Sequence, residues 1–109
     1  MRLSPHDPYL FGMLAAMASA HLSTGRYAEA LSWAEKASRL RPDYLLAACI
    51  IAVSRALAGR IEEARNAVAT LLRVDPELRI SNLKGVVSYL QDIDFAKWVD
   101  GLRKAGLPE

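Results

Sequence analysis

Residues 25–30 read Gly-Arg-Tyr-Ala-Glu-Ala, and residues 59–64 read Gly-Arg-Ile-Glu-Glu-Ala. The same shift of 34 residues (59 − 25) places Pro8 on Pro42 and Pro42 on Pro76. A fixed period of this size is typical of a supersecondary unit that stacks on its neighbours to bury an apolar face. The sequence therefore predicts a repeat architecture.

Each unit has the pattern of two helices joined by a tight turn. In the first unit, residues 9–23 are almost all apolar or small, and Gly25 is the residue type that ends a helix in a left-handed conformation. Residues 27–40 then carry apolar side chains at helical spacing. A shift by one period predicts the helices of the second unit at residues 45–58 and 61–74.

The third unit departs from this pattern. We expect its first helix at residues 78–90 and a last helix at 95–105, capped by Asp94 and ended by Gly106. Trp98 occupies the position at which both earlier units have alanine, which predicts different packing. A divergent final pair is typical of the capping element of a repeat stack.

These patterns predict a single all-α domain over residues 1–109. Its repeats would span residues 9–42 and 43–76, followed by a capping helix pair at 77–106. Residues 2–5 also resemble the end of a second helix, since Arg-Leu-Ser-Pro echoes Arg-Leu-Arg-Pro at 39–42. From that echo we expect the chain to be the C-terminal part of a longer protein.

The composition narrows the possible functions. The chain has 109 residues, 52% of them hydrophobic, which suits one domain and is too little for separate catalytic and substrate domains. A formal charge of +2 favours neither nucleic acid nor an anionic membrane as a partner. Cys49 is the single cysteine, residues 1–8 do not read as a signal peptide, and no apolar run has the length of a membrane span. We therefore expect a cytoplasmic domain.

The repeat resembles the tetratricopeptide repeat, a helix-turn-helix unit of 34 residues. The resemblance is carried by small residues at the helix crossing, a turn glycine and a closing proline: Ala18, Gly25, Ala30 and Pro42 in the first unit, and Ala52, Gly59, Ala64 and Pro76 in the second. Tyr27 adds the aromatic position, whereas Leu14 and His21 replace the family's usual Trp and Tyr. The resemblance implies a right-handed α-solenoid of about six helices.

A narrower resemblance concerns residues 3–8, 21–27 and 101–109. These segments are similar to the C-terminal repeat region of bacterial adenylate or guanylate cyclases, or of winged-helix regulators. The resemblance implies the regulatory or assembly region of a bacterial signalling protein. No cyclase residue has a counterpart here, because the catalytic domain is absent from the sequence.

In this family a partner binds the concave surface formed by the first helix of each unit. The resemblance places that groove at small and apolar residues: Ala15, Ser19 and Leu22, then Leu46, Cys49, Val53 and Leu57, then Leu83 and Val87. The Lys and Asn pairs with which chaperone-cofactor repeats hold a peptide carboxylate are missing. An apolar helix or strand of a protein partner therefore suits the groove better than an acidic C-terminal peptide.

The same apolar residues have a second explanation. The domain's own last helix, further repeats of a longer chain, or a second copy of the chain would cover them equally well. Residues 45–58 are apolar almost all round, which requires burial on two sides. The sequence thus predicts a protein-protein interaction module, with a homodimerisation module that packs through the apolar first helices as the alternative.

No group of residues indicates an active site, a metal or a cofactor. A metal site needs three or four converging ligands, and His6 and His21 lie on different predicted elements. Cys49 has no Lys or His neighbour to lower its pKa, so an unreactive thiol is expected. Carboxylates such as Glu35, four residues before Arg39, suit ion pairs on helix surfaces. We expect a non-catalytic segment without a small-molecule substrate, even if the parent protein is an adenylate cyclase.

Overall fold

The first two repeat units form two helical hairpins. A computed structural model describes residues 8–85 and 92–109, with side chains described from 13 to 85 and from 95 to 109. The elements are the helices α1 (Pro8–Ser23), α2 (Tyr27–Leu40), α3 (Leu45–Leu57) and α4 (Ile61–Val74), the short 3-10 helix η1 (Ile80–Gly85), and α5 (Asp92–Lys104). No strand occurs within these described residues, so the predicted all-α class is confirmed.

Three glycines end helices as predicted. Gly25, Gly59 and Gly106 have φ angles of 81°, 85° and 96°, which side chains other than hydrogen rarely allow. After α1, Arg26 N–H donates to the carbonyl of His21 at 2.9 Å, and the equivalent bonds follow α3 and α5. This pattern satisfies carbonyls that would otherwise lack a partner at the helix end.

Small residues bring the helices of the two hairpins together. Ala18, Ala30, Ala34, Ala52 and Ala64 are fully buried, as the predicted helix crossings require. Short side chains let helices approach closely, and the ridges of one helix then fit the grooves of the next. Each hairpin is closed in this way, and α2 also packs on α3, which joins the two units.

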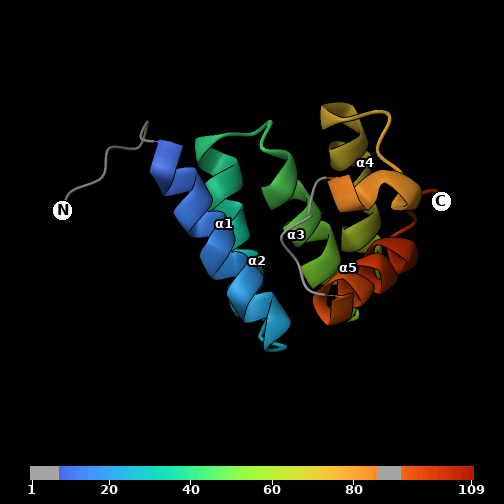
Figure 1. Cartoon of the computed structure of the whole chain (residues 1–109), viewed down its shortest axis with the longest axis horizontal. Helices are drawn as coiled ribbons and strands as arrows, with labels where there is room; N and C mark the ends of the chain where they lie inside the picture. Colours follow the sequence, from blue (N-terminus) through green and yellow to red (C-terminus); the bar gives the residue numbers. More distant parts are fainter. Residues whose placement is uncertain (1–7, 86–91) are drawn as a thin grey trace.

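Helix α3 lies at the centre of the molecule. It contacts α1, α2, α4 and α5, and Figure 1 shows it between α1 at one end of the molecule and α5 toward the other. Most of its residues are buried, from Ala47 through Ala56. The segment is apolar on nearly all sides because other helices pack around it, as the sequence predicted.

The predicted helix at 78–90 is wrong over its first part, where the chain forms only η1; residues 86–90 lie outside the described residues. Local side-chain hydrogen bonds compete with an α-helix at this point. The Asn82 amide donates to the carbonyl of Glu77 at 2.8 Å, and its oxygen accepts from Arg79 N–H at 2.8 Å. In an α-helix the side chain of Asn82 would not make both bonds.

The C-terminal segment holds η1 in place. Ile80 N–H donates to the carbonyl of Pro108 at 2.9 Å, and Ser81 N–H donates to the carbonyl of Glu109 at 3.0 Å. The Arg103 guanidinium donates to both carboxylate oxygens of Glu109, which lowers the pKa of that carboxyl. The C-terminal residues thus accept hydrogen bonds from the N–H groups of Ile80 and Ser81, which the sequence pattern did not predict.

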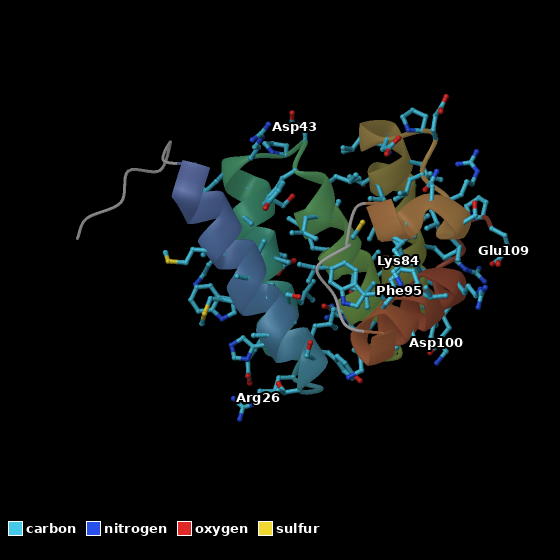
Figure 2. All side chains as sticks on the ribbon, viewed as in Figure 1. Arg26, Asp43, Lys84, Phe95, Asp100 and Glu109 are labelled. Carbon is cyan, nitrogen blue, oxygen red and sulfur yellow. The ribbon has the colours of Figure 1, made fainter. Side chains whose placement is uncertain are left out.

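The last helix begins earlier than expected, at Asp92 in place of residue 95. Its Trp98 is fully buried, and its Phe95 ring lies 5.0 Å from the Lys84 ammonium of η1 (Figure 2). The prediction that Trp98 packs differently from the alanines of the earlier units agrees with this position. A large ring fills the space between α5 and the rest of the core.

Candidate functional site

The predicted groove residues lie together in the interior of the protein. Six of them are buried, Leu46 and Leu57 are partly buried, and Val87 lies outside the described residues; the buried ones are Ala15, Ser19, Leu22, Cys49, Val53 and Leu83. All of these buried residues except Ser19 belong to the main apolar cluster. In the structure, most of the predicted groove residues are therefore part of the hydrophobic core and do not line an open groove.

Helix α5 packs on α3 and covers Val53, one of the predicted groove residues. A methyl group added at Gly101 would lie 3.0 Å from the Cγ1 atom of Val53, so the backbone of α5 rests directly on that side chain. Glycine at this position permits the close approach. Of the two explanations that the sequence left open, coverage by the domain's own last helix describes the environment of Val53.

Helix α5 also reaches the end of α1. The Lys97 ammonium donates to the carbonyls of Leu22 and Ser23, at 3.4 and 3.2 Å. These carbonyls belong to the last turn of α1, where the helix dipole favours a positive charge. The contact links residues that are far apart in sequence, and it joins α5 to the end of α1.

The thiol of Cys49, also on α3, is buried in the core. Burial, and to a lesser extent the negative charge of Asp75, raises the pKa of the thiol from its usual 9.0 to about 12. Since the thiolate is the reactive form, we expect folded protein to resist Ellman's reagent at pH 8 and unfolded protein to react at once. The matched control is Cys49→Ala with Ala69→Cys, which places the thiol at an exposed position of α4.

The same pKa shift predicts a pH dependence of stability. The unfolded chain loses the thiol proton near pH 9, whereas the folded chain holds it until about pH 12. The contribution of Cys49 to stability is therefore complete below pH 9 and declines as the pH rises through this window.

Rapid labelling of the folded protein at pH 8 would contradict the buried position of Cys49.

The largest uncovered apolar side chains lie on α1. Met13 is 48% exposed and Met17 is 40% exposed, and the exposed Ala16 and Ala20 lie on the same face of the helix. We call these four residues the α1 stripe. Figure 2 shows sulfur atoms, in yellow, projecting from the side of α1 that faces away from the other helices. Helix α1 contains no Asp, Glu, Lys or Arg, so its exposed face is uncharged.

The repeat gives the α1 stripe a counterpart on α3. One period later the four positions are Ala47, Ile50, Ile51 and Ser54, which are buried or partly buried. On α3 this face receives α2: Ala47 shares a small buried cluster with Ala37 of α2. The same face is thus covered by a helix in the second unit and bare in the first.

A pocket lies where α2, α3 and α4 meet. Its volume is about 280 Å³, and it is lined by residues of α2, of the α2–α3 connection, of α3 and of α4: Glu35, Ser38, Arg39, Pro42, Ala48, Ile51, Arg55, Ala67 and Thr70. Arg55 Nη2 lies 3.7 Å from Glu35 Oε2, and its Nη1 donates to the carbonyl of Glu63 at 3.2 Å. Glu35 thus pairs with α3 and not, as predicted, with Arg39. This arginine joins three helices.

A charged contact joins the surfaces of α1 and α2. His21 Nδ1 lies 3.5 Å from Glu29 Oε2, a contact between α1 and α2 that was not predicted from the sequence. Within residues 8–85 and 92–109, no three His, Cys, Asp or Glu side chains come together as metal ligands. No helix in this part of the chain is long and apolar enough to cross a bilayer.

No family model matches this sequence, and no curated protein matches it. A function for this chain must therefore be inferred from the surfaces of its described residues. Sequence reasoning did not single out the α1 stripe, although it had a signal: residues 8–23 lack charge, and two methionines stand four residues apart. Residues that stay apolar on every face of a helix need a second contact.

Proposed function

We propose that this chain is a protein-protein interaction module of the tetratricopeptide type, a right-handed stack in which α1 offers its outer face to another helix. The module carries out no catalysis of its own. The observation that carries the proposal is the α1 stripe, which is uncovered where the equivalent face of α3 is covered by α2. A partner helix would complete on α1 the packing that the second unit already has.

The chemistry of the α1 stripe supports a protein partner. Methionine side chains are flexible and polarizable, and they are common on surfaces that adapt to different partners. An uncharged apolar face at i, i+3, i+4 and i+7 matches the apolar face of an amphipathic helix. A nucleic acid would need a basic surface, which the α1 stripe lacks.

The groove residues predicted from the family resemblance are not the surface that we propose. Cys49 and Val53 are both fully buried, and α5 rests directly on Val53, so a partner would have to displace that helix to reach Val53. The resemblance of the chain ends to cyclase and winged-helix regulator proteins supports a place in the C-terminal region of a cytoplasmic signalling protein. There the module would hold a partner or a sister subunit.

The test uses the helix that covers α3 in this same chain. A fluorescent peptide of residues 27–40, held helical by a staple on its exposed face, is titrated with the folded protein and followed by fluorescence anisotropy. We expect saturable binding. Met17→Arg should weaken it by about fivefold or more, because the arginine stands in the middle of the contact.

Ala69→Arg is the matched control, since it adds the same charge at an exposed position of α4. It should leave the affinity unchanged. Equal binding by the wild-type protein and Met17→Arg would show that the peptide does not dock on the α1 stripe, and a lack of saturable binding would refute docking of this helix there.

A further inference from the structure

We infer that the helix that occupies the α1 stripe is α1 of a second copy of this chain, running antiparallel. This inference rests on the proposed function and names its partner. It also moves the homodimer contact away from the predicted residues Leu46 and Val53 to the outer face of α1, because α5 already covers Val53.

Large and small residues alternate in the α1 stripe so that two antiparallel copies would fit together, with each large side chain opposite a small one. In an antiparallel pair with a two-fold axis between residues 16 and 17, Met13 lies opposite Ala20 of the second copy, and Met17 lies opposite its Ala16. Each long side chain thus meets a short one, at both ends and in the centre. In a parallel pair in register, Met13 and Met17 would meet themselves, and the alanines would leave space unfilled.

The charge pattern also favours a second copy. Self-association of a charged face brings like charges together, and α1 has no Asp, Glu, Lys or Arg to oppose its own image. Helices α2 and α4 differ in this respect, because they expose Glu29, Lys36, Glu62 and Arg65. Symmetric contacts of this kind use the same patch on both subunits.

The size of the α1 stripe sets the expected affinity. Stable complexes bury about 800 Å² per partner, and one face of a single helix offers less. We therefore expect a weak dimer, with dissociation in the micromolar range or above. Sedimentation velocity of the intact chain from micromolar to millimolar concentrations should show a shift from monomer to dimer.

Substitution of the stripe gives the first test of the inference. Met17→Arg should weaken the dimer about tenfold or more, because the two introduced charges lie near the two-fold axis. Ala69→Arg should sediment like the wild-type chain. Circular dichroism confirms that each variant is folded. A wild-type chain that stays monomeric to millimolar concentration overturns the inference, and so does a dimer that Met17→Arg leaves intact.

Disulfide trapping tests the direction of the helices. Met13→Cys and Ala20→Cys are oxidised separately and as a mixture, with Cys49 protected by burial. In the antiparallel pair, residues 13 and 20 face each other, whereas residue 13 lies about 10 Å along the helix from its own copy, beyond disulfide reach. The mixture should therefore give more cross-linked dimer than either variant alone. Preferential cross-linking of Met13→Cys to itself overturns the antiparallel arrangement.

The two proposals fail in different ways. A monomeric chain that still binds the peptide of residues 27–40 at the α1 stripe rejects the second copy and retains helix docking as the function. A chain that neither dimerises nor binds the peptide rejects both.

Discussion

Replacing Trp98 with alanine should lower the free energy of unfolding by about 3–5 kcal/mol. Trp98 is fully buried, with 0% of its surface accessible, and it is the largest of the fully buried side chains. Its indole nitrogen has no hydrogen-bond partner among the described residues, so the loss comes from packing and from the cavity left behind. Urea unfolding followed by circular dichroism measures the change.

Two further variants make the Trp98 result interpretable. Trp33→Ala removes the same ring from a half-buried position on α2 and should cost less. Trp98→Phe keeps an aromatic ring in the core and should fall between the wild type and Trp98→Ala. If Trp98→Ala unfolded at the same urea concentration as the wild type, α5 would not be packed on the core as described.

Replacing Val53 with arginine should destabilise the fold by at least about 3 kcal/mol, since the charge would enter an apolar interior without a partner. Val53 is 0% exposed, and Gly101 of α5 rests on it. The matched variant is Met17→Arg, which adds the same side chain at an exposed helix position and should change stability by less than about 0.5 kcal/mol. Both are measured by urea unfolding under identical conditions.

The Val53 result separates the two explanations of the apolar first helices. If α5 covers α3, Val53→Arg is a stability variant. If the face of α3 were an open groove for a partner, Val53→Arg would leave the unfolding free energy close to that of the wild type. That second outcome would restore the groove predicted from the family resemblance.

Local signals in the sequence predicted the two hairpins well. Gly25 and Gly59 lie at turns because a positive φ favours glycine, a property that belongs to single residues and their neighbours. The apolar spacing over residues 27–40 and 61–74 gave helices α2 and α4 with the same bounds. Signals that involve only neighbouring residues, such as turn glycines and helical spacing, therefore predicted the structure correctly.

Contacts between distant residues were not predicted from the sequence. Asn82 keeps the start of the third unit out of an α-helix, and the donors of Ile80 and Ser81 pair with carbonyls at the end of the chain. Lys97 reaches the last turn of α1 from α5, across 75 positions of sequence from Leu22. Nothing in residue periodicity specifies such pairs.

The surface proposed from the structure differs from the predicted groove because contacts between distant residues decide which positions are covered. The family resemblance selected residues on α1 and α3 by their place in each unit, and Val53 holds that place while lying under α5. The position of α5 depends on how Trp98 and Gly101 fit the core, which is a property of the assembled helices. In the sequence the α1 stripe showed itself only through a lack of charge and two methionines four residues apart.

Methionine methyl groups offer the most direct view of helix docking on α1. The chain is labelled at its methionine methyls and titrated with the helical peptide of residues 27–40 while NMR spectra are recorded. Docking on the α1 stripe predicts that the methyl signals of Met13 and Met17 move together and saturate at one peptide concentration, and that in Met17→Arg the Met13 signal moves only at higher peptide concentrations. Saturable peptide binding with both methyl signals unmoved would show that the peptide binds elsewhere, and the function proposed for α1 would be wrong.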